Sequence, residues 1–503
     1  MKQLGVLDTA FINLEQTNTP QHIGGLGIYD PSTAPGGVVR FKQVIANFEK
    51  RLNRLPLFRT RLHEVPGNID RPYWVVDENF DVEFHLRHIA LPHPGDWRQL
   101  CIQIARLHAR PLDMSRPLWE AYIIEGLDKI PALPEGSFAI YTKMHHALVD
   151  GAGGQSFMAA LHDLEPDPEE TNYLLNQKPL IIDRQPNAGE LVVRAVLNQT
   201  KNTLTMASGS VGLAKDFAKL GYGILRKTIP RPDIQAPKTR FNDPVGKHRV
   251  FEALSFKVED FKFVKNAFGI KLNDVALAVV AGAMVRYLTH VGEAPETSLV
   301  ATIPMDMRTR RGENGDNNQV GSVFCKLHTD IADPVERLKA IHESANVAKE
   351  FGEKSPLVDA LKLVGVLSPW FAKSGAKLYS SGKISRHMPV NVSTVVTNVP
   401  GPDFDLYIAG ARLVQYHALG VLTPGVGLFH AVFSFGSALT ISVLADRDQL
   451  DQPDKYCEFL NDSFKELYAL AEKAVYTAEI NKQQSIKPAR RKKTASSSKS
   501  DVV

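Results

Sequence analysis

The chain has 503 residues, 44% of them hydrophobic, 8% aromatic and 23% charged, a globular composition that excludes collagen-like, wholly disordered and disulfide-scaffold proteins. Its length exceeds the roughly 250–300 residues at which a single hydrophobic core stops growing, so we expect more than one domain. The net charge is +4, but residues 482–503 alone carry +6, which leaves −2 on the rest of the chain and argues against a nucleic-acid-binding body.

Three cysteines lie far apart in the sequence, at Cys101, Cys325 and Cys457. This spacing fits neither a disulfide framework nor a zinc-binding pattern, and a reducing compartment is the default expectation. The N-terminus lacks the continuous apolar stretch of a signal peptide, and no run approaches the roughly 18–20 apolar residues of a membrane-spanning helix. We therefore expect a cytoplasmic protein that is soluble or peripherally associated with a membrane.

The first 165 residues mix strand and helix patterns. An apolar run at 138–144 predicts a strand, and residues 155–164 follow with apolar side chains at helical spacing. From 166 to about 245 the chain is punctuated by prolines around a helical middle, which is typical of a linker. We therefore expect an N-terminal domain over 1–165 and an interdomain linker over 166–245.

The helical middle of this linker is amphipathic. Its apolar side chains fall on one face, with basic residues nearby: Leu213, Phe217, Leu220 and Ile224, with Lys215, Lys219, Arg226 and Lys227. A helix that packs across the domain junction is one interpretation, and a helix that lies on a membrane surface is the alternative.

The mixed pattern resumes in a C-terminal domain over 246–480. Periodicity predicts strands at 253–258, 298–304 and 390–398, and helices at 273–290 and 334–349. A second apolar stripe, from Leu357 to Phe371, indicates core packing or membrane contact. The basic, low-complexity tail at 481–503 is predicted to be disordered and serves either to keep the chain soluble or to attract anionic lipid.

The clearest local pattern is His145-His146 followed by Asp150-Gly151, where a predicted strand ends and a helix begins. Such a turn displays functional groups at the open edge of a sheet. A metal site would need a third ligand, which is not visible nearby, and two structural histidines are another interpretation. A histidine base fits best, because imidazole has a pKa of about 6.5 and can remove a proton that an alcohol, with a pKa of roughly 16, does not release unaided.

This HHxxxDG pattern is the signature of the CoA-dependent acyltransferase superfamily, and four further blocks narrow the resemblance. They are LDTAFINLEQTNTPQHIGGL (7–26), PLDMSRPLW (111–119), LND (272–274) leading into VRYL (285–288), and TNVPGP (397–402). The chain resembles the bacterial wax ester synthase/diacylglycerol acyltransferase family over nearly its whole length, the linker and tail excepted.

The resemblance implies an α/β fold of two chloramphenicol-acetyltransferase-like subdomains, with mixed sheets flanked by helices and an active site in a tunnel at their interface. It implies transfer of a fatty acyl group from acyl-CoA to a long-chain alcohol, giving wax ester, or to diacylglycerol, giving triacylglycerol. The CoA thioester is a substrate, and no cofactor or metal is expected. Two greasy substrates favour work at a membrane or lipid-droplet surface.

The resemblance also assigns residues. His146 is the general base, His145 lines the site, and Gly151 leaves room beside the base. Asp150 is structural and orients the loop through an arginine, for which Arg308 is the candidate.

Three further residues carry open alternatives. Thr397 is either a donor to the thioester oxyanion or a strand-end residue that bonds locally. Asn273 and Asp274 are interpreted as a helix N-cap pair with Asp274 in a structural role, and a contact from Asn273 to substrate or to the facing domain is the alternative.

Other functions remain to be weighed. The sequence lacks a G-x-S-x-G elbow, which argues against a serine acyl-enzyme. The alternatives are an amide-forming condensation enzyme, for which no carrier module is present, and a non-catalytic coat protein of lipid inclusions with the same fold.

Overall fold

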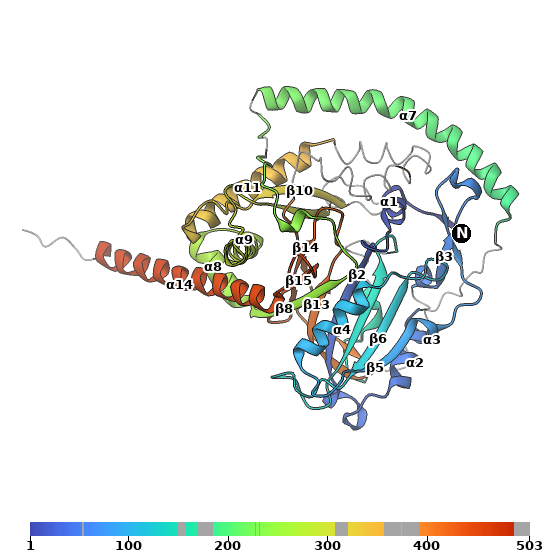
Figure 1. The fold of residues 1–503 in the computed structure, drawn as a ribbon, viewed down its shortest axis with the longest axis horizontal. Helices are drawn as coiled ribbons and strands as arrows, with labels where there is room; N and C mark the ends of the chain where they lie inside the picture. Colours follow the sequence, from blue (N-terminus) through green and yellow to red (C-terminus); the bar gives the residue numbers. More distant parts are fainter. Residues whose placement is uncertain are drawn as a thin grey trace, which may run out of the picture.

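The computed structural model describes residues 1–52, 55–148, 157–167, 185–226, 228–230, 232–306, 320–356, 374 and 392–486. These residues form two six-stranded mixed sheets and one three-stranded sheet, with helices around them (Figure 1). The predicted α/β class, with mixed sheets flanked by helices, is confirmed.

The first large sheet has the order β12-β13-β2-β7-β6-β5. Its strands are β2 (His22–Asp30), β5 (Leu86–Ala90), β6 (Trp119–Glu125), β7 (Phe138–His145), β12 (Tyr407–Ile408) and β13 (Ala411–Leu419). The last two come from the C-terminal half of the chain, so the boundary expected near residue 245 divides the sequence but not the sheets. Glycines in β2 allow the approach, since a Cβ on Gly25 would lie 2.0 Å from the hydroxyl of Tyr416.

The second large sheet has the order β10-β9-β11-β14-β15-β8. Its strands are β8 (Arg249–Lys257), β9 (Val300–Asp306), β10 (Val320–Lys326), β11 (Thr394–Pro400), β14 (Leu428–Phe435) and β15 (Ala438–Asp446). Its helices are α8 (Val258–Phe268), α9 (Leu272–His290), α11 (Pro334–Lys354) and α14 (Pro453–Ile486). The two sheets pack together, because Phe433 of β14 shares a hydrophobic cluster with Phe138 and Ile140 of β7.

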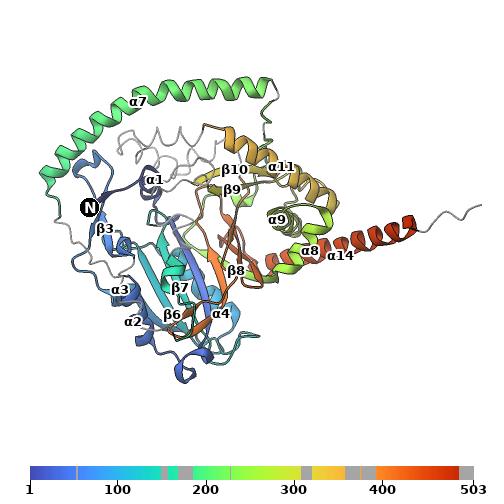
Figure 2. The same cartoon turned by 180° about the vertical axis from the view of Figure 1, so that it is seen from behind.

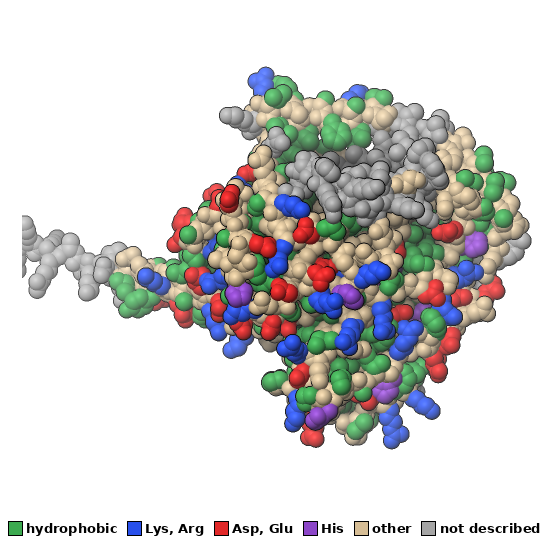
Figure 3. Space-filling model, viewed as in Figure 1, with side chains coloured by type: hydrophobic (Ala, Val, Ile, Leu, Met, Phe, Trp, Pro, Cys, Tyr) green, Lys and Arg blue, Asp and Glu red, His purple; other side chains and the backbone are tan. Residues whose placement is uncertain are grey.

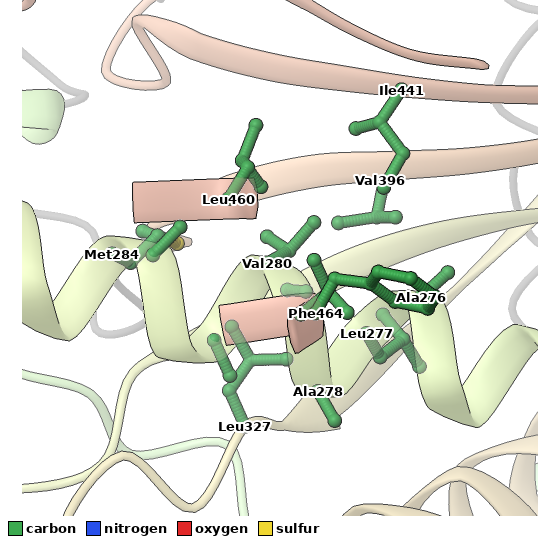
Figure 4. Packing of buried hydrophobic residues seen from close by; sticks show 14 of the residues in the cluster. Ala276, Leu277, Ala278, Val280, Met284, Leu327, Val396, Ile441, Leu460 and Phe464 are labelled. Carbon is green, nitrogen blue, oxygen red and sulfur yellow. The ribbon is translucent and has the colours of Figure 1, made fainter. Parts of the chain in front are cut away.

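Helix α9 is the centre of the C-terminal core. It is apolar on all sides and thirteen of its residues are buried against the sheet, α8, α11 and α14 (Figure 4). Gly282 admits α14, since a Cβ there would lie 2.7 Å from Ser463 Oγ. Among the described residues α9 is the one helix long and apolar enough to cross a membrane, and its burial identifies it as a core helix.

The remaining elements belong to the N-terminal half and the linker. They are α1 (Val6–Leu14), α2 (Phe41–Leu52), α3 (Val82–His85), α4 (Trp97–Ala109), α7 (Ala188–Leu225) and the three-stranded sheet of β1 (Lys2–Gln3), β4 (Tyr73–Val76) and β3 (Thr60–His63). Helix α7 arches over one end of the molecule, from the three-stranded sheet towards α11 (Figures 1 and 2).

Helix α7 begins with a capping box, in which Asn187 and Glu190 satisfy each other's backbone amides. Leu191 and Ala195 then pack against the three-stranded sheet. Asn198 secures this end by donating to Asp70 Oδ2 at 2.6 Å. The linker thus contains the predicted helix.

Periodicity located the other elements well. The predicted strand at 138–144 is β7, and the helices at 273–290 and 334–349 are α9 and α11. Of the helix predicted at 155–164, the described part is helical over 157–161. The prediction of disorder from 481 is wrong at its start, because α14 continues through residues 481–486. The rest of the tail and the stripe from Leu357 to Phe371 lie outside the described residues.

Candidate active site

Both motif histidines lie where β7 leaves its sheet. His145 is still paired, opposite His22 of β2, and its amide donates to the carbonyl of Leu118 at 2.9 Å. His146 makes one last contact, from its amide to the carbonyl of Gln21 at 2.8 Å. The Leu148 amide then donates back to the carbonyl of His145, so the chain turns at once and presents His146 at the carboxyl end of the strand.

The His146 ring is held from one side. It stacks on Phe11 of α1, with ring centroids 4.0 Å apart and planes 13° from parallel. Its Nδ1 is buried and has no hydrogen-bond partner among the described residues, while the residue as a whole is partly exposed. We therefore expect a substrate to meet the ring at Nε2.

Burial lowers the pKa of His146 from its usual 6.5 to about 4, and the neighbouring His145 acts in the same direction. At pH 7, well above this pKa, the ring is neutral and can accept a proton. Burial makes the imidazole a weaker base but keeps it in the acceptor form throughout the neutral range.

His145 plays a different part, because its ring is fully buried and does not line an open surface. Its Nδ1 accepts a hydrogen bond from the Ala147 amide at 3.0 Å, which shapes the turn. Its Nε2 lies 3.4 Å from Glu15 Oε2. That carboxylate also accepts a hydrogen bond from the Gln21 amide at 2.5 Å.

The end of α1 thus supports both histidines: Phe11 lies in the helix against His146, and Glu15, the C-cap residue, lies near His145. Sequence reasoning missed these two residues, although both lie in the block at 7–26.

Glu15 should act as a positioning residue. We expect Glu15→Ala to lower kcat about tenfold with little change in KM for acyl-CoA, because the turn that aims His146 loses its support. Glu15→Gln should recover most of this rate, because an amide oxygen can still accept the Gln21 proton. The measurement is steady-state acyl transfer, with the exposed Glu49→Ala as the matched control; a change in KM alone would contradict the positioning role.

A buried polar layer lies beneath the histidines. His22 Nε2 donates to the His108 carbonyl at 2.6 Å, and His108 Nε2 donates to the Gly420 carbonyl at 2.9 Å. His108 Nδ1 must then accept from the Tyr141 hydroxyl, 2.6 Å away. Burial lowers the pKa of His108 to about 3, so the ring is neutral at pH 7, and its two hydrogen bonds determine the tautomer. The layer joins α4 of the first half to the loop between β13 and β14.

Thr397 lies on the side of β11 that faces the N-terminal half. Side chains alternate along a strand, and Val395 and Val399, two residues to either side, pack against clusters of the first sheet. Val396 faces the opposite way, into the α9 core. The orientation suits an oxyanion donor, and Thr397 makes no hydrogen bond with His146 in the described part of the chain.

Asn273 lies on the other side of β11, where its Oδ1 accepts from Asn398 Nδ2 at 3.3 Å. It therefore connects α9 to the strand that bears Thr397. The expectation of an N-cap pair is wrong in detail: the N-cap is Lys271, and Asp274 at the third helical position accepts the Lys271 amide at 3.0 Å.

Asp274 is buried and pairs with His342 of α11, with 2.5 Å between Oδ2 and Nδ1. This contact joins two helices of the C-terminal core. Asp150, Gly151 and Arg308 lie outside the described residues, so the pairing of Asp150 with Arg308 stays a prediction, as does the tunnel.

The described part of the chain contains no group of three His, Cys, Asp or Glu side chains placed to hold a metal ion. A cavity of about 260 Å³ lies at the opposite end of β7, lined by Phe41, Ile123 and Phe138 among others, and is separate from His146.

Comparisons with known proteins identify the family of the chain. Residues 4–276 match the family model of the wax ester synthase/diacylglycerol acyltransferase catalytic domain, and residues 317–468 match that of its C-terminal domain. A Mycobacterium bovis protein named as a diacylglycerol O-acyltransferase is 31% identical, covering 92% of this chain and 97% of its own length.

Solved structures agree as well. The wax ester synthase/diacylglycerol acyltransferase from Marinobacter aquaeolei superposes with a TM-score of 0.65 at 26% identity, over 94% of this chain and 100% of its own. Trichothecene 15-O-acetyltransferase from Fusarium sporotrichioides shares the fold alone, with a TM-score of 0.54 at 11% identity over 93% of this chain and 94% of its own.

Proposed function

The chain belongs to the wax ester synthase/diacylglycerol acyltransferase family, and we propose that it transfers a fatty acyl group from acyl-CoA to the hydroxyl of a long-chain alcohol or of a diacylglycerol. The observation that carries this function is the His146 ring. It is neutral, reachable through Nε2 and held at the end of β7 in a chain that matches the family over most of its length.

The proposed reaction is direct transfer in one ternary complex. His146 Nε2 takes the proton of the acceptor hydroxyl while that oxygen bonds to the thioester carbonyl carbon. The carbonyl electrons move to oxygen and return as the carbon–sulfur bond breaks. The CoA thiolate then leaves and receives the proton from His146, so the products are an ester and free CoA thiol.

The transient oxyanion needs a donor, and we propose the Thr397 hydroxyl. Its strand faces the N-terminal half, and Asn273 tethers the neighbouring residue Asn398. A donor fixed on a strand of a packed sheet is preorganised, which is the property that makes oxyanion stabilisation effective.

We also propose that the enzyme works in the cytoplasm at the surface of a membrane or lipid droplet. The reason is chemical, since long-chain alcohols and diacylglycerols partition into lipid rather than water. A peripheral enzyme would draw both greasy substrates from that surface and release CoA into water.

A competition assay tests the function. Purified full-length protein is given palmitoyl-CoA with equal amounts of hexadecanol and a diacylglycerol, free thiol is followed with time, and the lipid products are separated by chromatography. We expect thiol release that depends on an acceptor, with wax ester, triacylglycerol or both. The absence of acceptor-dependent thiol release would contradict the proposal and favour a non-catalytic lipid-inclusion protein.

A further inference from the structure

The side of helix α7 that faces away from the protein is unexpectedly apolar. Among the described side chains of α7, we name as the outer stripe seven exposed hydrophobic ones, leaving out Phe217: Val192, Val193, Val196, Leu197, Val211, Tyr222 and Leu225. All but Val192 have more than half of their surface exposed, up to 83% at Leu225. Figure 3 shows hydrophobic side chains along this helix.

The outer stripe is a face of the helix rather than scattered exposure. At about 100° per residue its members centre on one direction, while the buried Leu191, Ala195 and Leu220 centre about 160° away. The face noted in the sequence, with Leu213 and Ile224, lies on that inward side, where both are partly buried. The helix is thus apolar on its packed side and again on its solvent side.

A surface helix of a globular protein normally places polar residues outward. The 38 residues of α7 span about 57 Å, and the members of the outer stripe fall in two described groups along it, at 192–197 and 211–225. Large exposed apolar surface of this kind marks an interaction site.

The charges along α7 indicate the kind of partner. Its five described basic residues are all exposed and fall within about 60° of one another on one flank of the outer stripe: Arg194, Lys201, Lys215, Lys219 and Arg226. The helix also carries two described acidic residues. Glu190 belongs to its N-terminal capping box, and Asp216 forms an ion pair with Lys219. An apolar face with a basic flank complements a lipid surface, in which acyl chains lie beneath negatively charged headgroups.

We propose that the outer stripe of α7 is the surface by which this protein docks on an anionic lipid interface. The stripe inserts at the level of the acyl chains, and the basic flank meets the headgroup phosphates. A second copy of the chain is a poorer partner for this flank, because two copies would bring like charges together. This proposal rests on the proposed function in one respect: a lipid acyltransferase has a reason to bind a lipid surface, because its acceptor substrates are there.

Vesicle flotation with the full-length protein tests the surface without any substrate. We expect the protein to float with vesicles of phosphatidylcholine and phosphatidylglycerol, and less with phosphatidylcholine alone. The double variant Val193→Glu/Leu197→Glu should lose at least about tenfold in binding. The matched control, Val38→Glu/Tyr476→Glu, places the same charges on exposed hydrophobic side chains elsewhere and should float like the wild type.

Two results would overturn the proposal. One is equal flotation of the stripe variant and the wild type. The other is a wild-type protein that does not bind vesicles but self-associates, as measured by light scattering, while the stripe variant stays monomeric. That result would make the stripe an interface between copies of the chain. Thiol release with a short, water-soluble alcohol is measured in parallel, and the stripe variant should keep the wild-type rate. Flotation of a wild-type protein that releases no thiol with hexadecanol or diacylglycerol would refute the enzymatic function alone.

Discussion

Replacing His146 by alanine is expected to lower kcat for acyl transfer by about 10²–10⁴-fold, the usual contribution of a positioned general base. The alcohol proton then has no acceptor within reach, while both substrates can still bind. KM for acyl-CoA should therefore change little. Steady-state thiol release from palmitoyl-CoA, with and without hexadecanol, measures both constants.

The variant should remain folded, because the His146 Nδ1 has no hydrogen-bond partner in the described part of the chain and the substitution removes mainly the stacking on Phe11. Circular dichroism and thermal unfolding check this. His88→Ala, a half-exposed histidine beside Glu125, is the matched control and should keep normal turnover. Wild-type kcat/KM should also fall only as the pH approaches about 4. A folded His146→Ala protein with near-normal kcat would show that another group is the base.

The sequence was sufficient for elements whose pattern is set locally. The apolar run at 138–144 predicted β7, and the continuous apolar run after Asn273 predicted α9, because a strand or helix buried on its faces must be apolar there. The motif at the end of β7 was found for the same reason, since a pair of histidines at a strand end is visible without any tertiary contact.

What escaped prediction depends on distant pairing. Strand β13 joins β2 across almost 390 residues, a register that the β13 sequence does not specify by itself. Phe11 and Glu15 gain their roles only when α1 packs beside β7. The outer stripe of α7 was not predicted, because the apolar residues of the inward face already formed a regular helical pattern and the interpretation of the helix was based on that face.

Replacing the buried Arg51 by methionine should destabilise the fold by about 3–5 kcal/mol, the range for breaking one half of a buried ion pair. Arg51 of α2 bonds the Asp163 carboxylate and donates through Nη1 to the carbonyls of Ala160 at 3.0 Å and His162 at 2.9 Å. These residues follow the motif loop in the chain, and the Asp163 backbone pairs with Tyr407 of β12. Urea unfolding measures the loss, and kcat should fall with it as the loop's far end loosens.

The cause can be separated from simple loss of packing. In Arg51→Met/Asp163→Asn the stranded carboxylate is gone, so the double variant should be more stable than Arg51→Met alone. The matched control is the exposed pair Arg286–Glu466, 2.8 Å apart, where Arg286→Met should cost less than about 1 kcal/mol because water screens the lost charge. Equal effects of Arg51→Met and Arg286→Met would mean that the buried pair does not anchor the chain behind the motif loop. A double variant as unstable as Arg51→Met would instead assign the loss to the two carbonyls, which methionine leaves without a donor.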